Sequence, residues 1–202
     1  MTDNDLGPWL PLTVAAIGEE LRTASFRWFI AGGHALELAL GTSWRPHDDL
    51  DIGVCRKDLG TVFQHLHDWD LHVGAAGVLA PWEGQPLSEQ RHENNIWARR
   101  STADPWAFDI TVGGGNDEVW WSRRDPSVRL PWAGAVAHES GIPYLAPHVQ
   151  LLMKSTSARP KDDLDAEMVI PELQRGQREW LAGLLPPDHP WQRILHQSDI
   201  NR

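Results

Sequence analysis

Apolar and polar residues alternate with two different periods along the first seventy residues. The pattern predicts, in order, a helix at 12–24, a strand at 27–31, a short helix at 34–40, a strand at 49–54 and a helix at 58–69. The first strand stops at Gly32-Gly33, and Gly41 is a suitable C-terminal cap for the short helix. Helices and strands that follow one another in this way predict a mixed sheet with helices on its faces.

The middle of the chain is rich in strand-forming residues, and the end is helical. Strands are expected at 71–79, 95–100, 106–112 and 119–132, and helices at 149–153, 162–170, 178–185 and 191–197. The glycine run at 113–115 is expected to form a flexible connection or hairpin loop. We therefore expect an α+β catalytic domain over residues 1–145 and a helical cap over residues 146–202.

Composition and charge limit the possible functions. The 202 residues have a formal net charge of -10, a single cysteine, and no apolar run close to the roughly 20 residues that a bilayer span requires. The chain cannot form an internal disulfide or a multi-cysteine metal site, and its N-terminal segment lacks the basic start of a signal peptide. These features predict a cytoplasmic protein, with a neutral or cationic small molecule favoured over nucleic acid as its partner.

Carboxylates occupy one face of two expected strands. Period-two geometry places Asp49 and Asp51 on the face opposite to the apolar residues of the strand at 49–54, and Asp109 has the same position in the strand at 106–112. Like charges so close together are usually tolerated because a divalent cation lies between them. If the two strands are neighbours, the three carboxylates converge on a site that suits magnesium and phosphoryl transfer. Solvent-facing aspartates without a function are the alternative.

A larger combination of residues is more specific than the carboxylates alone. Gly32-Gly33-His34 is followed by Arg45-Pro46-His47 and then by the two aspartates of the acidic strand. The chain thereby resembles the nucleotidyltransferase superfamily with a polymerase-β-like fold. Within it, the similarity is to aminoglycoside 2''-adenylyltransferases and lincosamide nucleotidyltransferases. His34 departs from that pattern, which usually has tryptophan at this position.

The resemblance implies a fold and a division of roles. The fold would be a mixed sheet with flanking helices and a C-terminal helical region. Asp49, Asp51 and Asp109 would form the catalytic and metal site for Mg²⁺, with Asp109 either completing it or taking the proton from the acceptor hydroxyl. The nucleoside triphosphate implied by this resemblance is ATP, and the residues that would bind it are Gly32, Gly33, His34 and Arg45.

Lys154 is a further candidate for the phosphate site. It begins a lysine-arginine-lysine pattern, completed by Arg159 and Lys161, that resembles an element in several nucleotidyltransferase groups. Its ammonium group would bind the triphosphate, unless it only offsets the dipole at a helix C-terminus. A zinc site of His65 and His67 is not expected, because two residues that lie two apart in a helix do not share a face.

The sequence therefore predicts an enzyme. It would transfer a nucleoside monophosphate to a hydroxyl of a small molecule, such as an aminoglycoside-like or lincosamide-like antibiotic, and release pyrophosphate. Two alternatives stay open: a toxin-like nucleotidyltransferase that acts on tRNA or protein, and a catalytically silent nucleotide-binding module. The sequence gives no indication of the oligomeric state.

Overall fold

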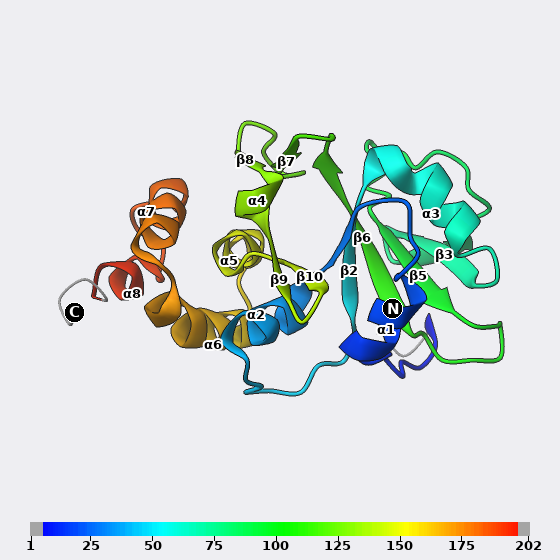
Figure 1. The fold of residues 1–202 in the computed structure, drawn as a ribbon, viewed down its shortest axis with the longest axis horizontal. Coiled ribbons are helices and arrows are strands. Elements are labelled where there is room, and N and C mark those ends of the chain that lie inside the picture. The colour runs from blue at the N-terminus through cyan, green and yellow to red at the C-terminus, as the bar shows by residue number, and fades with distance from the viewer. Residues whose placement is uncertain (1–5, 198–202) are drawn as a thin grey trace.

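A mixed β-sheet forms the body of the protein in a computed structural model that describes residues 6–197 (Figure 1). Among the described residues, strands follow the order β4-β3-β5-β6-β2-β1-β10-β9 across the sheet, and β7 and β8 extend it from one end of β6. The strands are β1 (Trp28–Ile30), β2 (Asp51–Cys55), β3 (Asp70–Ala75), β4 (Val78–Pro81), β5 (Asn95–Arg99), β6 (Phe108–Gly115), β7 (Val119–Trp121), β8 (Arg129–Pro131), β9 (Val136–Glu139) and β10 (Ile142–Leu145).

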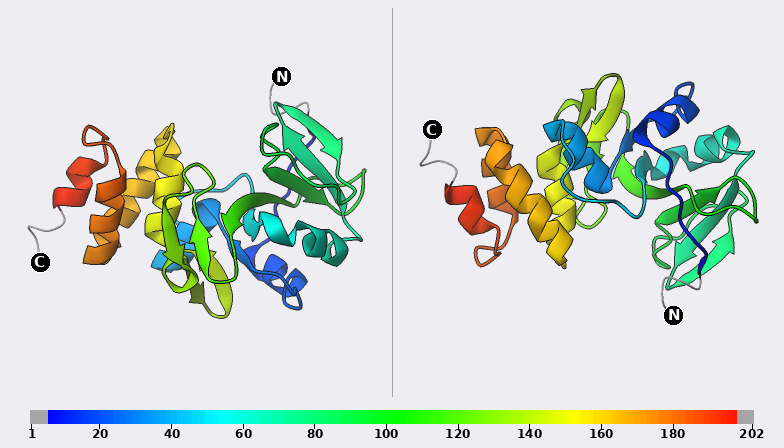
Figure 2. Two further views of the ribbon diagram at one scale, coloured as in Figure 1. Left: turned by 90° about the horizontal axis from the view of Figure 1, so that it is seen from above. Right: turned by 90° about the horizontal axis from the view of Figure 1, so that it is seen from below.

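Helices flank the sheet and also make up the C-terminal region. The helices are α1 (Val14–Glu20), α2 (Gly32–Leu40), α3 (Leu59–His65), α4 (Trp132–Ala135), α5 (Pro147–Ser155), α6 (Pro160–Val169), α7 (Arg175–Leu184) and α8 (Gln192–Gln197). The last three lie at the end of the molecule opposite to β3, β4 and β5 (Figure 2). This architecture confirms the expected α+β class of a mixed sheet with flanking helices. No helix in the described range is long and apolar enough to cross a membrane.

The period-two pattern correctly predicted which faces of β2 and β6 are buried. The apolar residues of both strands are at most 2 % exposed: Leu50, Ile52, Val54, Phe108, Ile110 and Val112. The strands pair in parallel, so that these side chains form one layer of the main core. The aspartates consequently project from the opposite face.

Several local expectations were wrong, among them the strand at 119–132, which is divided into β7 and β8. Gly113–Gly115 are not a loop: they continue β6, since Gly113 pairs with Cys55 and the next two glycines pair with β7. Bulky side chains lie close to this stretch; a Cβ on Gly114 would meet the ring of Trp121, which explains why glycine can serve in a strand here. The segment at 71–79 is a hairpin of β3 and β4 that turns at Ala76-Gly77, where both residues have positive φ.

Asp49 lies just before β2 rather than within it, because the pairing of β2 with β6 begins at Asp51 and its pairing with β1 at Ile52. The C-terminal helices have a second apolar cluster, to which α2 contributes Leu36. A boundary between domains at residue 145 stays a prediction. Because α2 belongs to both parts of the core, the helical region is packed against the element that begins at Gly32.

We predict that Gly53→Ala destabilises the fold. A Cβ on Gly53 would overlap the ring of Phe29 on the neighbouring strand, and overpacking a core costs about 1–3 kcal/mol. Urea unfolding would measure the loss. Gly183→Ala is the control, because this exposed glycine in α7 has open space around it and the change should stabilise by about 0.5–1 kcal/mol. Equal effects of the two changes would contradict this account of Gly53.

Candidate active site

The pairing of β2 with β6 brings two of the candidate carboxylates side by side. Asp51 and Asp109 are direct Cα partners, and the backbone N–H of Asp109 donates to the carbonyl of Leu50 at 2.8 Å. Asp49 is close enough that its charge raises the pKa of both carboxylates. In the described part of the chain, however, the oxygens of the three aspartates do not all lie within 4.8 Å of one another. The aspartates are therefore neighbours without forming a closed cage.

Burial makes ionisation of these carboxylates costly. Removal from water, followed by repulsion from Asp49, raises the pKa of Asp51 to about 7. Burial, followed by repulsion from Asp51, raises the pKa of Asp109 well above its usual range. A divalent cation would relieve this repulsion, so the electrostatics of the site fit the expected magnesium.

One oxygen of Asp109 is available for such a cation. The side-chain amide of Asn95 donates to Oδ2 of Asp109 at 2.6 Å, whereas the buried Oδ1 has no hydrogen-bond partner among the described residues. A buried polar atom without a partner is costly unless an ion or water binds it. The donor set of carboxylate oxygens therefore fits a hard cation such as Mg²⁺.

The glycine pair stands beside the carboxylates. Gly32 has a φ of +66°, which favours glycine, and a Cβ there would overlap the carboxylate of Asp51. The N–H of Gly32 donates to Oε1 of Gln150 at 2.9 Å, and a Cβ on Gly33 would overlap Arg45 and His47. Glycine is thus required here by the close approach of side chains, and phosphate binding by the pair stays a prediction.

Arg45 points toward a carboxylate of the C-terminal helices. Its guanidinium donates two hydrogen bonds to Asp165, each 2.8 Å long, and the Asp165 side chain is fully buried. This bidentate pair fixes the loop that precedes β2. Arg45 therefore has a structural role in this conformation, and its contact with phosphate stays a prediction.

Lys154 is also held by carboxylates. Its ammonium lies 2.8 Å from Asp162 and 3.0 Å from Asp165, and its side chain is only 8 % exposed. Burial opposes ionisation of Asp162, but hydrogen bonds from Arg159 and Lys154 outweigh it and hold the Asp162 pKa well below its usual range. The ammonium group still acts on the site, because its charge lowers the pKa of Asp51.

A cavity of about 190 Å³ opens beside Asp51, Gly32 and Lys154. Its apolar wall includes Phe29, Val112, Trp120, Trp121, Leu145 and Met153. Arg123 also lines it, half-buried, and no hydrogen bond or ion pair to this guanidinium is present in residues 6–197. Sequence reasoning missed Arg123, Asn95 and Gln150. Only their place in the fold brings them to the carboxylates, and no spacing in the sequence indicates it.

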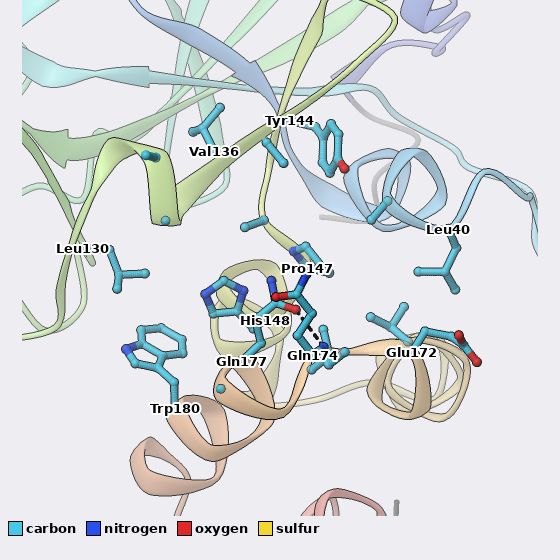
Figure 3. Close-up of a pocket in the computed structure, with 18 of the residues that line it drawn as sticks. Leu40, Leu130, Val136, Tyr144, Pro147, His148, Glu172, Gln174, Gln177 and Trp180 are labelled. Atoms are coloured by element: carbon cyan, nitrogen blue, oxygen red, sulfur yellow. Dashed lines mark hydrogen bonds between the residues drawn. The ribbon is translucent and has the colours of Figure 1, made fainter. Parts of the chain in front are cut away.

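A larger groove of about 930 Å³ lies elsewhere (Figure 3). Residues of α2, α4, α5 and α7 line it, among them His148 and Trp180, whose rings are 4.9 Å apart. Burial lowers the pKa of His148 to about 4, so the imidazole is neutral at physiological pH. None of the candidate residues lines this groove, and we do not assign the reaction to it.

Cys55 does not serve as a nucleophile in this conformation. Its side chain is only 1 % exposed, although it has the same strand parity as Asp51. Burial raises the pKa of its thiol to about 11, which leaves almost no thiolate at neutral pH. Cys55 is a core residue.

Comparison with known proteins agrees with this arrangement. The family model described as aminoglycoside-2''-adenylyltransferase matches residues 13–74, a range that includes the glycine pair and the acidic strand. Residues 13–74 are thus similar to the aminoglycoside-2''-adenylyltransferase family. The matched range ends before Asp109 and Lys154, so for these two residues the argument rests on geometry. No curated protein matches the chain in sequence.

Solved nucleotidyltransferase structures share the fold. The lincosamide antibiotic adenylyltransferase LnuA, bound to lincomycin, is 17% identical with a TM-score of 0.50, and the match covers 82% of this chain and 94% of that one. ANT(2'')-Ia in complex with adenylyl-2''-tobramycin is 13% identical with a TM-score of 0.51, and its solution structure gives 13% and 0.55. Both ANT(2'')-Ia matches cover 93% of this chain and 97% of that one. These likenesses confirm the expected fold.

We predict that Asp51→Asn changes how stability depends on pH. In the metal-free protein the folded state keeps a proton on Asp51 up to about pH 7, whereas the unfolded chain releases it near pH 4. The free energy of unfolding should therefore fall as pH rises between these values. In the Asp51→Asn variant this decrease in the free energy of unfolding should be smaller by roughly 1–3 kcal/mol.

Urea unfolding at pH 4 and pH 8, with a chelator present, would measure the difference. Asp48→Asn, at an exposed neighbouring position, should leave the pH dependence unchanged. Addition of Mg²⁺ at pH 8 should stabilise the wild type more than the Asp51→Asn variant. An unchanged pH dependence in Asp51→Asn would contradict the raised pKa.

Proposed function

We propose that the protein transfers a nucleoside monophosphate, AMP from ATP, to a hydroxyl of a small molecule and releases pyrophosphate. The observation that carries the proposal is the β2–β6 register, which pairs Asp51 with Asp109 beside Gly32. The relationship to antibiotic nucleotidyltransferases supports the reaction class. The acceptor would be a hydroxylated antibiotic, as the bound lincomycin and adenylyl-tobramycin of the structural neighbours suggest.

Asp49, Asp51 and Asp109 would hold Mg²⁺ in this proposal. The ion would supply charge neutralisation at the triphosphate and align the groups for in-line displacement. Asn95 fixes Oδ2 of Asp109, so Oδ1 is the atom available either as a metal ligand or as the acceptor of the proton from the attacking hydroxyl. Burial raises the pKa of Asp109, which makes its ionised form a stronger proton acceptor.

The nucleotide would occupy the cavity beside Asp51. Its apolar wall, which includes Trp120 and Trp121, offers flat surfaces for a base. Lys154 and Arg159 border the same cavity but are paired with Asp162. Arg123 is the half-buried cation of the cavity that has no such partner in the described chain. We assign it to the phosphates, for which the sequence alone predicted Gly32, Gly33, His34, Arg45 and Lys154.

The acceptor class follows from charge and from the relatives. A net charge of -10 disfavours a polyanionic acceptor such as tRNA and suits a neutral or cationic small molecule. The cytoplasmic location expected from the N-terminal sequence stays a prediction.

The first test is pyrophosphate release. Wild-type protein with ATP, Mg²⁺ and a panel of hydroxylated aminoglycosides and lincosamides should release pyrophosphate and form an adenylylated product. Asp49→Ala and Asp51→Ala should lower the rate by at least about 100-fold, as expected for the loss of a group that binds transition-state charge. Undiminished activity in both variants would overturn the mechanism. ATP binding without turnover on any acceptor would favour the silent module instead.

The second test concerns Arg123. A hydrogen bond between charged groups contributes about 1.5–3 kcal/mol, so Arg123→Ala should weaken Mg-ATP binding at least about tenfold in calorimetry. Arg123→Lys should retain part of the affinity, since the positive charge remains. Arg124→Ala is the matched control, because this exposed neighbour donates to the carbonyl of Met153 and does not line the cavity. Equal losses at the two positions would contradict the assignment.

A further inference from the structure

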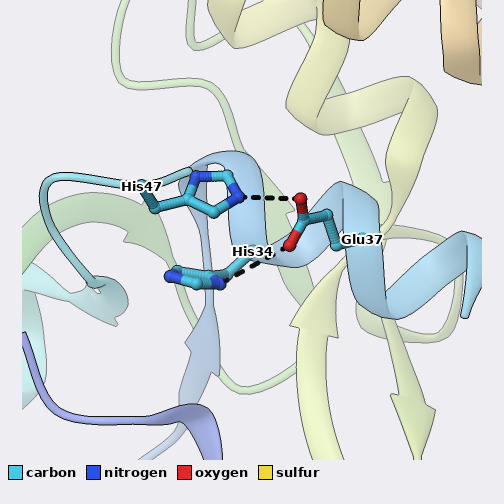
Figure 4. A group of neighbouring side chains, drawn as sticks. All are labelled: His34, Glu37 and His47. Carbon is cyan, nitrogen blue, oxygen red and sulfur yellow. Dashed lines mark ion pairs between the residues drawn. The ribbon is translucent and has the colours of Figure 1, made fainter. Parts of the chain in front are cut away.

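Two histidines and a glutamate form a cluster that the proposed reaction does not use as a unit. His34 and Glu37 lie one turn apart on α2, and His47 faces them from the loop that leads to β2 (Figure 4). One ligand atom from each of these three residues lies within 4.8 Å of the other two. The two imidazole rings are in contact, with their centroids 4.1 Å apart and their planes tilted by 38°. This is the one such triad found among residues 6–197.

The His47 side chain has a buried nitrogen that faces the Glu37 carboxylate. The side chain is 7 % exposed, and its Nε2 lies 3.0 Å from Oε1 of Glu37 without a well-formed hydrogen bond among the described residues. Oε1 of Glu37 already accepts from the Ser43 hydroxyl and the Trp44 N–H. A buried imidazole nitrogen that points at a carboxylate without a hydrogen bond is suited to a cation between them.

The surroundings favour the ligand form of His34. Burial, and then the adjacent His47 ring, lower the pKa of His34, so its imidazole is neutral at physiological pH. Neutral imidazole is the form that coordinates metals. The charges of Glu37 and Asp49 act on the pKa of His34 in the opposite direction, whereas the charge of Arg45 adds to the lowering.

We propose that His34, Glu37 and His47 form a binding site for a divalent transition metal ion, with Zn²⁺ the best match. Two imidazoles and one carboxylate are a common protein ligand set for zinc, and they leave a fourth position for water. Ligand atoms around tetrahedral zinc lie about 3.4 Å apart, given bonds of about 2.0–2.1 Å. The present spacings lie on either side of that value: Nε2 of His47 is 3.0 Å from Oε1 of Glu37, and Nδ1 of His34 is 3.9 Å from Oε2 of Glu37. Carboxylate oxygens suit Mg²⁺ whereas imidazoles suit zinc, so the two sites differ in selectivity.

Arg45 is the contact that must give way. Its Nη1 lies 3.0 Å from Nδ1 of His47, whereas a ring bound to metal through Nε2 carries its proton on Nδ1. Nη1 also donates to the carbonyl of Pro46 at 3.2 Å, and the other two nitrogens of the guanidinium remain bound to Asp165. Metal binding therefore breaks the contact between Arg45 and His47, while the two hydrogen bonds from Arg45 to Asp165 remain.

A metal ion here would fasten the loop at 42–48 to α2. That loop ends at Asp49, and α2 begins at Gly32, so both sides of the proposed reaction site would be held by the ion. Its role would be positional. The inference does not depend on the proposed nucleotidyl transfer, because metal binding can be measured without substrate.

The test measures metal binding directly. After chelator treatment, the Asp51→Asn variant, which weakens the magnesium site, would be titrated with Zn²⁺ in the presence of excess Mg²⁺, and Co²⁺ would be used as a spectroscopic probe. We expect one equivalent of Zn²⁺, a visible Co²⁺ band typical of four-coordinate sites, and a higher Tm with Zn²⁺.

Variants of the cluster identify the ligands. His34→Phe keeps a ring in contact with His47 but removes a ligand, and it should weaken Zn²⁺ binding by well over tenfold, since even outer-shell changes cost 10- to 100-fold. Glu37→Gln should do the same. His67→Ala, at an exposed histidine, should change nothing. The proposal is overturned if no stoichiometric binding occurs, or if His34→Phe binds Zn²⁺ as tightly as its parent.

Discussion

The buried carboxylate of Asp165 connects two segments that border the candidate site, the loop before β2 and helix α5. It is fully buried and accepts from the guanidinium of Arg45 at 2.8 Å and from the indole of Trp44 at 3.0 Å, while the ammonium of Lys154 lies 3.0 Å away. These partners come from the loop before β2 and from α5. Removal of one partner from a buried ion pair costs about 3–5 kcal/mol, because the other charge is left without compensation. The position of the loop that leads to Asp49 is therefore determined by the C-terminal helices as well as by the sheet.

This ion-pair network limits which positively charged side chains near the site are available to bind phosphate. Arg45 and Lys154 were expected to bind phosphate, yet both are paired with carboxylates that stay ionised, since hydrogen bonds outweigh burial and lower the pKa of Asp165. A phosphate that recruited either cation would have to leave Asp165 undercompensated. Arg123 is not paired with a carboxylate in the described part of the chain. A cation without a partner at the edge of an apolar cavity can bind an anion at lower cost.

The local sequence pattern predicted which face of each strand is buried, but not which strands lie next to each other. The alternation around Asp51 and Asp109 correctly placed their side chains opposite the core, because side-chain direction in a strand depends only on its period. The register that joins them is a long-range property, which no local spacing encodes. For the same reason the contact of Arg45 with Asp165, 120 positions later, was not foreseen. The His34–Glu37 pair is visible as a helical spacing, but His47 joins it only through the path of the loop.

The burial that raises the pKa of Asp51 also determines what the site can bind. Without a cation, the buried carboxylates of Asp51 and Asp109 resist full ionisation, because the negative charge of one raises the pKa of the other. A divalent ion reverses that preference by supplying the charge that the low-dielectric surroundings lack. The same surroundings strengthen every charge interaction with a bound triphosphate. Metal and nucleotide would therefore bind with positive coupling, since each supplies the charge that makes the other less costly to bury.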